Sequence, residues 1–294
     1  MSKFVLSCCS TVDLNPDWMK KKDINYICFN YTVDGVPYKD DMGVSVKTAD
    51  LHKRMLDGAD AKTSQVSVGE YIEYFTSFLQ EGNDILHCTL STGISGTYSS
   101  ACQAAEILKE QFPERKIYIV DSLEASSGYG LFMDKLSDLK NNGMDLEELY
   151  KWAEEHKLYV NHWFFSSDLT FFIRGGRVSK TAGAIGKVLS ICPLLNVDYM
   201  GRLISREKIR TKKKAILRMA EKMEELAYKG LDYSDKVFIS NSDPEGARAL
   251  ADLISERFPK ISGKVEIFDI GATIGCHTGP GTVALFFWGK KRVD

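Results

Sequence analysis

The first half of the chain alternates short apolar runs with segments of helical period, and this alternation limits the possible folds more than any other feature. Residues 4–8, 84–91 and 116–121 are apolar runs of strand length, whereas residues 69–80 and 97–112 repeat their apolar side chains at helical spacing. Strands and helices in alternation favour parallel βαβ units, because a parallel connection needs a long crossover. Three further elements are expected in this half: a strand over 24–33 and helices over 126–141 and 145–156.

The second half mixes helices and strands without clean βαβ repeats. We expect strands over 159–166, 237–241, 265–270 and 283–288, and helices over 211–229 and 244–258. The start of the last helix is typical, since Asp243 can cap it and Pro244 suits its first position. The sequence therefore predicts an α/β fold of two unlike domains. Residues 1–160 form the parallel-sheet α/β domain, and residues 161–294 form an α+β domain.

Composition excludes several classes of protein. Aromatic residues make up 11% of the chain and the net charge is −2, which argues against a disordered chain and against a nucleic-acid-binding protein. No apolar run approaches the roughly 18 residues that span a bilayer, and the first residues lack a secretory apolar segment. The seven cysteines and five histidines are scattered. We expect a cytoplasmic protein with no integral membrane segment, no disulfide framework and no metal site.

Residues 91–100, STGISGTYSS, carry the clearest local signal. They follow a predicted strand and open a predicted helix, where unpaired backbone N–H groups and the helix dipole attract anions. Gly93 and Gly96 let the main chain approach a ligand closely. The segment lacks the Gly-Lys-Ser/Thr of a P-loop and the GxGxxG of a dinucleotide site. Two interpretations stay open, an anion site and a plain capped turn.

Four other segments could carry chemistry, and each also has an ordinary structural interpretation. Residues 63–65, TSQ, are a polar triplet before a helix, and residues 174–177, RGGR, place two arginines beside flexible backbone. Residues 271–281 are expected to form a glycine-rich loop between two strands that holds His277, which indicates a ligand wall or a structural histidine. Residues 208–214, KIRTKKK, indicate a solvated face or a surface for a protein partner.

Six motifs in this order resemble the DegV family of bacterial fatty-acid-binding proteins. They are TSQ (63–65), STGISGTYSSA (91–101), VDS (120–122), RGGRVS (174–179), KIRTKKKAI (208–216) and GCHTGPGTVAL (275–285). The resemblance extends from about residue 4 to about residue 290. It implies two unlike α/β domains, a bound long-chain fatty acid, no cofactor, and a protein that is not itself an enzyme. It further implies that the bound acid is handed to a fatty acid kinase.

The resemblance also assigns residues. The expected ligand-binding residues, on the segments that hold the carboxylate, are Thr63, Ser64, Ser95, Gly96, Thr97, His277 and Thr278. Arg174 and Arg177 are expected on a surface that meets the kinase. The physics suits a lipid carrier, because each buried CH₂ contributes about 0.8 kcal/mol and a few donors suffice for the carboxylate.

Two residues depart from the family pattern. Cys9 stands where the family usually has an acidic residue, and Val66 follows TSQ where proline is common. The first change alters charge near the expected domain interface. The alternatives are a hydrolase or an acyl or phosphoryl transferase that uses Ser95 and His277, and a structural or regulatory binding protein for another amphipathic anion. A Ser–His contact with an orienting carboxylate would favour the enzyme.

Overall fold

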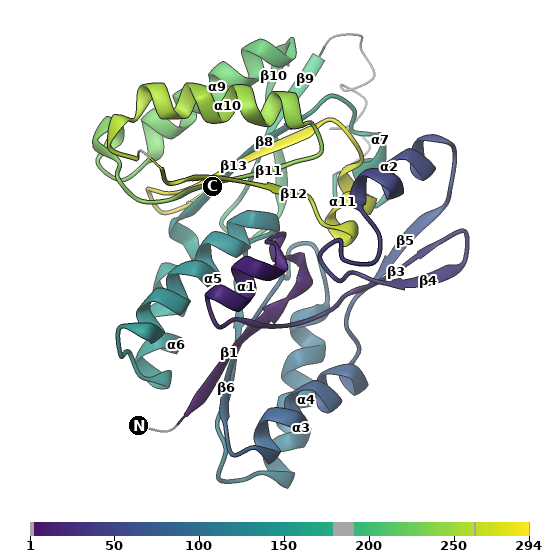
Figure 1. The fold of residues 1–294 in the computed structure, drawn as a ribbon, viewed down its shortest axis with the longest axis vertical. Coiled ribbons are helices and arrows are strands. Elements are labelled where there is room, and N and C mark those ends of the chain that lie inside the picture. Colours follow the sequence, from purple (N-terminus) through teal and green to yellow (C-terminus); the bar gives the residue numbers. More distant parts are fainter. Residues whose placement is uncertain (1–2, 179–190, 262, 294) are drawn as a thin grey trace.

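The strands that the structure describes form three sheets (Figure 1). The structure is a computed structural model that describes residues 3–178, 191–261 and 263–293, and all elements given below lie in these ranges. The strands are β1 (Phe4–Cys9), β2 (Asn25–Ile27), β3 (Asn30–Val33), β4 (Val36–Lys39), β5 (Ala61–Ser64), β6 (Asp84–Thr89), β7 (Ile117–Asp121), β8 (Val160–Ser166), β9 (Ile191–Val197), β10 (Leu203–Arg210), β11 (Val237–Asn241), β12 (Val265–Asp269) and β13 (Thr282–Trp288).

Helices connect and cover these strands. The α-helices are α1 (Pro16–Lys21), α2 (Thr48–Leu56), α3 (Val68–Gln80), α4 (Thr97–Gln111), α5 (Ser126–Asn141), α6 (Leu146–His156), α7 (Thr170–Arg174), α9 (Lys212–Leu226), α10 (Pro244–Arg257) and α11 (Ala272–Thr278). Short 3₁₀ turns are η1 (Ser10–Val12), η2 (Lys157–Tyr159), η3 (Gly230–Asp232) and η4 (Pro259–Ile261). Among the helices of these ranges, none is long and apolar enough to cross a membrane.

The first sheet is parallel, in the order β2-β1-β6-β7. Helices α3 and α4 lie to one side of it and α5 and α6 to the other (Figure 1). Every residue of β6 is buried, which suits a strand covered on both faces. Apart from the run over 24–33, the strands and helices predicted here from periodicity are confirmed, and so is the parallel sheet. The sequence predicts this part well, because strand-length apolar runs alternate regularly with segments of helical period.

The second sheet is mixed, in the order β10-β9-β8-β13-β11-β12. Strands β11 and β12 are parallel, whereas β13 runs antiparallel to both β8 and β11. Helices α9 and α10 cover one face and α5 packs on the other (Figure 1). The predicted combination of an N-terminal parallel sheet and a C-terminal α+β part is confirmed. The boundary near residue 160 stays a prediction, since α5 precedes it and packs against β8, β11 and β13.

Two predicted elements were wrong. The run over 24–33 is not one strand, because β2 joins the parallel sheet and β3 joins the antiparallel sheet β4-β3-β5. The residues of both pieces favour strands, so propensity alone does not reveal the break. The glycine-rich segment over 271–281 is not a loop, because it contains α11. Its first turn is held from outside, since Thr273 N donates to Asp40 Oδ2 at 3.0 Å.

The basic segment 208–214 is largely exposed and leads into the helix predicted from residue 211. Its first residues end β10, and Thr211 then caps α9 through Lys214 N. Strands β9 and β10 had no counterpart in the prediction. Their antiparallel pairing contains a register shift between Ser205 and Glu207, and most of β10 is only half-buried. A strand with this irregular pattern gives little periodic signal.

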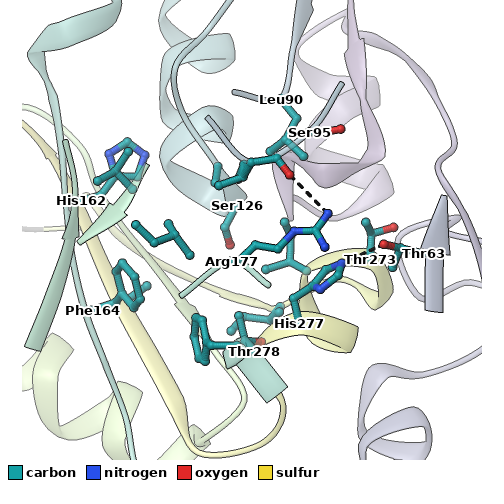
Figure 2. A pocket seen from close by; sticks show the side chains of 18 of the residues that line it. Thr63, Leu90, Ser95, Ser126, His162, Phe164, Arg177, Thr273, His277 and Thr278 are labelled. Atoms are coloured by element: carbon teal, nitrogen blue, oxygen red, sulfur yellow. Dashed lines mark hydrogen bonds between the residues drawn. The ribbon is translucent and has the colours of Figure 1, made fainter. Parts of the chain in front are cut away.

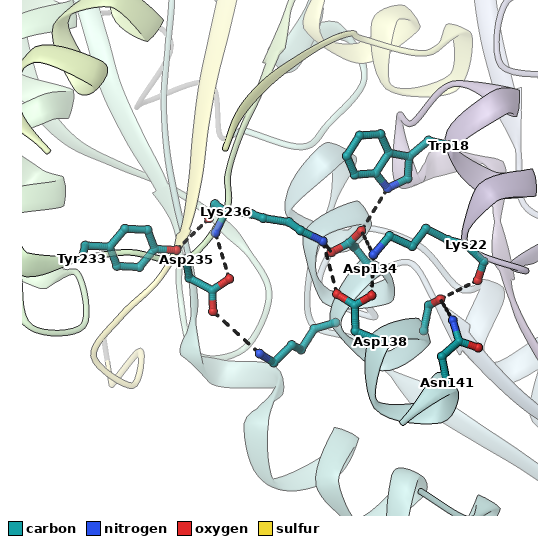
Figure 3. Close-up of polar contacts among 10 residues, drawn as sticks. Trp18, Lys22, Asp134, Asp138, Asn141, Tyr233, Asp235 and Lys236 are labelled. Carbon is teal, nitrogen blue, oxygen red and sulfur yellow. Dashed lines mark hydrogen bonds and ion pairs between the residues drawn. The ribbon is translucent and has the colours of Figure 1, made fainter. Parts of the chain in front are cut away.

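A buried carboxylate joins the two halves of the chain (Figure 3). Asp134 on α5 accepts a hydrogen bond from Trp18 Nε1 at 3.1 Å and pairs with Lys22 at 2.8 Å and with Lys236. Its side chain is 3% exposed, whereas the neighbouring Asp138, which pairs with both lysines, is 44% exposed. A buried charge must keep its partners. Asp134 therefore holds α1, α5 and the segment before β11 together.

Candidate functional site

A cavity of about 250 Å³ lies between the six-stranded sheet, α11 and the turn that precedes α4 (Figure 2). Its walls come from both halves of the chain, because the turn before α4 follows the parallel sheet while α7 and α11 belong to the second half. Most of the lining is apolar, and the polar groups gather near α11. An apolar cavity with a few convergent polar groups is the usual form of a small-molecule site.

Two neighbouring strands build one wall of the cavity. His162 and Phe164 on β8 lie opposite Phe286 and Ala284 on β13, and all four line the cavity. Alternate residues of a strand face the same side, so Thr282 continues this row toward α11. The row from Thr282 to Phe286 is about 13 Å long. The wall thus runs from a polar end beside α11 to a far end at His162.

His277 on α11 and Thr63 on β5 meet at the polar end. The distance between His277 Nε2 and Thr63 Oγ1 is 2.7 Å. Burial, together with the positive charge of Arg177, lowers the pKa of His277 to about 4, so the imidazole is neutral at pH 7. Gly175 makes room for the ring, because a Cβ there would lie 2.2 Å from His277 Nδ1. Within the described ranges this Nδ1 atom has no hydrogen-bond partner.

Arg177 reaches across the cavity between His277 and the turn before α4 (Figure 2). Its guanidinium donates to the carbonyl oxygen of Ile94 at 3.3 Å and to that of Gly175 at 2.5 Å. Burial lowers the pKa of Arg177. Among the residues that the structure describes, no carboxylate forms an ion pair with it. A half-buried guanidinium without a counter-ion is well suited to bind a carboxylate or phosphate.

Ser95 and Gly96 form the turn that completes the polar end. Ser95 Oγ accepts a hydrogen bond from Thr97 N at 3.3 Å, which leaves its own O–H free to donate. At Gly96 a Cβ would lie 2.4 Å from Gln65 Oε1, so glycine lets the Gln65 side chain lie against the turn. Gln65 in turn donates to Ser100 Oγ at 2.9 Å. The two polar motifs predicted from sequence, 63–65 and 91–100, are therefore in contact.

The structure brings together most of the predicted ligand-binding residues. Those that line the cavity are Thr63, Ser95, Gly96, His277 and Thr278. Ser64 does not, because it follows Thr63 in a strand and so faces the other way, toward solvent. Thr97 does not line it either, because its side chain is fully buried against the hydroxyl of Tyr71 at 2.9 Å. Direct contacts between these residues and a ligand stay a prediction.

The two arginines of RGGR are separated by the structure. Arg174 ends α7 and is exposed, with its guanidinium 5.4 Å from the centre of the Phe171 ring. Arg177 lines the cavity, so it does not share an exposed surface with Arg174. The tight turn at Gly176, where φ is +72°, sends the two side chains to different places. Ser179, the last residue of this motif, lies outside the described residues.

Several lining residues were not predicted. Gln65 could have been, because it lies two residues after Thr63 in extended chain and so faces the same side. Ser126, Thr273 and the apolar side chains of β8 and β13 carry no local motif. Their place in the cavity depends on sheet pairing between segments more than 100 residues apart. Only the tertiary structure reveals them.

Cys9 lies behind the turn before α4, in the core. Its Sγ atom is 3.3 Å from the hydroxyl of Tyr71, which also contacts Thr97. Burial raises the pKa of the Cys9 thiol to about 11, so it stays neutral. Where the family pattern has an acidic residue, this chain therefore has an uncharged one.

Among the described residues, the Ser95–His277 pair of the enzyme alternative does not form. His277 Nε2 contacts Thr63, and among the described residues no carboxylate hydrogen-bonds to His277 and Ser95 makes no hydrogen bond with it. Acyl-transfer catalysis of the Ser–His type needs both contacts. Over the same ranges, no group of three His, Cys, Asp or Glu side chains is placed to hold a metal ion.

Comparison with known proteins assigns the chain. The sequence pattern of the DegV family, described as an uncharacterised protein family, matches residues 8–290. The chain belongs to the DegV family. A DegV domain-containing protein of Clostridium perfringens is 35% identical over 293 residues, which cover 99% of each chain.

Solved DegV structures share the fold. A DegV lipid-binding protein of Thermotoga maritima superimposes with a TM-score of 0.83 at 28% identity, over 99% of this chain and 100% of that one. A second Thermotoga maritima protein, described by its fatty acid binding function, gives 0.83 at 27% identity with the same coverage. The resemblance stated from the six motifs is thereby confirmed at the level of family and fold.

Proposed function

We propose that this DegV protein binds one long-chain fatty acid, with the carboxylate at the polar end of the cavity and the acyl chain along β8 and β13. The observation that carries the proposal is Arg177, whose guanidinium reaches across an apolar cavity without a carboxylate partner among the described residues. A fatty acid supplies both missing parts, one negative charge and a long apolar body. The lipid binding of one Thermotoga maritima neighbour and the fatty acid binding of the other support the same class of ligand.

The polar end offers donors of the right kind. Arg177 supplies charge, Ser95 supplies a free O–H, and Thr63 with the neutral His277 supplies further hydrogen bonds. Hydrogen bonds to a charged group contribute about 1.5–3 kcal/mol each. These contacts offset the cost of removing the carboxylate from water, while burial of the methylenes drives binding at about 0.8 kcal/mol per CH₂.

The direct experiment is extraction of the purified protein with organic solvent, followed by mass spectrometry. We expect one long-chain fatty acid per chain. A cavity filled instead by a nucleotide or a sugar phosphate would contradict the proposal.

A matched pair of variants tests where the carboxylate binds. Arg177→Met removes the charge in the cavity, whereas Arg174→Met removes an equal charge from the exposed end of α7. We expect Arg177→Met to weaken fatty acid binding roughly 30-fold or more, since a desolvated charge left without its partner costs about 2–5 kcal/mol. Arg174→Met is expected to stay within about threefold. Equal affinities for the two variants would contradict this placement.

We further propose that the loaded protein presents its ligand to a fatty acid kinase and catalyses no step itself, as the family resemblance implies. The exposed Arg174 beside the cavity wall suits a contact with that partner. A reconstituted assay with the cognate kinase, ATP and loaded protein tests this proposal. We expect Arg174→Ala to lower acyl-phosphate formation strongly while ligand affinity is kept, and a variant that transfers normally would contradict a role for Arg174.

A further inference from the structure

The far end of the cavity is lined by His162, behind which lie two further buried polar side chains that the carboxylate site does not use. His162 lies on the opposite side of the cavity from Thr63 and His277 (Figure 2). Behind it, Glu124 Oε2 is 2.9 Å from His162 Nε2, and Glu124 Oε1 is 3.1 Å from the guanidinium of Arg292. The three side chains are at most 3% exposed. We call these residues, His162, Glu124 and Arg292, the floor triad.

Arg292 is tied to the main chain at three further points. Its guanidinium donates to the carbonyl oxygens of Leu123 at 3.0 Å, Lys157 at 3.1 Å and Asp198 at 2.9 Å. These carbonyls belong to the loop after β7, the turn before β8 and the turn after β9. One side chain near the end of the chain therefore links three segments behind the cavity.

His162 is held from the other side as well. Its ring packs edge-on against Phe286, with ring centres 5.1 Å apart. On α5, a Cβ at Gly128 would lie 2.3 Å from His162 Nε2, so the helix backbone lies against the ring. The imidazole is therefore in close contact with its neighbours on the sides that face away from the cavity.

A floor of this kind differs physically from an apolar one. Apolar side chains can change rotamer to admit a longer ligand, at the cost of weak contacts only. A longer ligand would push His162 against Glu124, and Glu124 is held in place by its ion pair with the buried Arg292. A buried charge separated from its partner is strongly destabilising. The far end of the cavity should therefore be more rigid than the apolar part of its wall.

We propose that the floor triad is a fixed stop that limits the length of the acyl chain this protein accepts. The inference rests on the proposed function, because it names which fatty acids the same cavity selects. The methyl end of the ligand meets His162 and Phe286. Acids that are too long lose affinity because His162 does not give way.

The test is a set of affinities for saturated acids of increasing length, laurate, myristate, palmitate, stearate and arachidate. For the wild-type protein we expect affinity to rise up to one length and then fall by about tenfold or more at the next. His162→Ala removes the ring, and His162→Asn keeps a polar group for Glu124 in a smaller side chain. In both variants we expect the best length to move to a longer acid, with a gain of about tenfold for each two added methylenes.

His87→Ala is the matched control, since His87 is an equally buried histidine that does not line the cavity. We expect it to keep the wild-type length profile even where it lowers overall stability. Glu124→Gln keeps the shape of the floor but removes its charge, and we expect it to weaken the cut-off against longer acids without moving the best length.

The outcomes separate this inference from the proposed function. If the wild-type protein selects a length and both His162 variants keep it, the triad is not the stop although the protein is a fatty acid carrier. If the wild-type protein binds none of these acids, both the proposed function and the stop are overturned. A shift in the His162 variants that His87→Ala does not share supports the stop.

Discussion

Single residues at the polar end combine charge, donors and backbone shape. Arg177 brings the charge, His277 stays neutral because of burial, and Ser95 keeps a free O–H because its oxygen already accepts from Thr97 N. Gly175 and Gly96 make the arrangement possible, since a Cβ at either position would lie under 2.5 Å from a neighbouring side chain. The absence of a side chain at Gly175 and Gly96 therefore shapes the site together with the polar groups of the other residues.

Ser95→Ala should weaken fatty acid binding by roughly 10- to 150-fold. The physical reason is the loss of one hydrogen bond to a charged group, worth about 1.5–3 kcal/mol. Ser64→Ala is the control, because Ser64 faces solvent from the same polar set of residues. Titration with a fluorescent fatty acid measures both, and equal affinities for the two variants would contradict a ligand contact at Ser95.

The neutral His277 predicts a pH dependence of stability. Its pKa in the folded protein is about 4, below the value of about 6.5 in the unfolded chain, so the unfolded chain binds more protons between these values. The contribution to stability is complete above about pH 6.5 and is lost as the pH falls toward 4. From about pH 7 to pH 5 the free energy of unfolding should fall by about 2 kcal/mol more in the wild-type protein than in His277→Gln. Urea unfolding at the two pH values measures this difference, and parallel curves for the two proteins would contradict it.

At the scale of elements, the pairing of β8 with β13 gives the cavity its long wall. The register places Phe164 opposite Ala284, so a large and a small side chain share one level of the wall. Helix α11 then adds the polar end, and Asp40 holds the first turn of that helix through Thr273 N. The helix and the strand pair come from the same half of the chain, whereas Asp40 and Thr63 come from the other.

Ala284→Leu should shorten the space for the acyl chain. The larger side chain occupies the level opposite Phe164 and displaces two to three methylenes, so affinity for the preferred acid should fall about 30-fold. Val283→Leu is the control, because Val283 faces away from the cavity on the same strand. Isothermal titration with both variants decides, and an unchanged affinity in Ala284→Leu would mean that the acyl chain takes another route.

At the scale of the whole molecule, the cavity needs both halves of the chain in fixed relative positions. Helix α5 supplies much of that connection, because it packs on η1 and on the six-stranded sheet. Asp134 on this helix pairs with Lys22 from the first half and Lys236 from the second (Figure 3). The halves are therefore joined by charge as well as by apolar packing.

Asp134→Asn should lower the free energy of unfolding by about 2–3 kcal/mol, because both lysines lose a buried counter-charge. Asp138→Asn is the matched control on the same helix. Its carboxylate is 44% exposed, and such pairs contribute under about 1 kcal/mol. Denaturant unfolding measures both variants, and equal losses would show that burial of Asp134 is not what makes its ion pairs stabilising.

The local sequence was sufficient to predict helices and strands whose apolar residues form a continuous run or repeat at a clear period. The buried strand β6 and the capped helices α3 and α10 appear in the structure near the predicted bounds. It was insufficient at β2 and β3, where one run of strand-forming residues belongs to two sheets. It also failed at α11, because glycine disfavours helices and the group that holds the first turn, Asp40, lies more than 200 residues away.

The sequence by itself determined the fold class, the family and the segments that carry the polar groups, because periodicity, glycine and hydroxyl residues act over short distances along the chain. Only the tertiary structure decided which of those residues face the cavity. Thr63 lines the cavity whereas its neighbour Ser64 faces solvent. Likewise, Arg177 lines the cavity whereas Arg174 is exposed. The reason is physical: the direction of a side chain depends on the phase of its strand or turn, and that phase is set by pairing with distant segments.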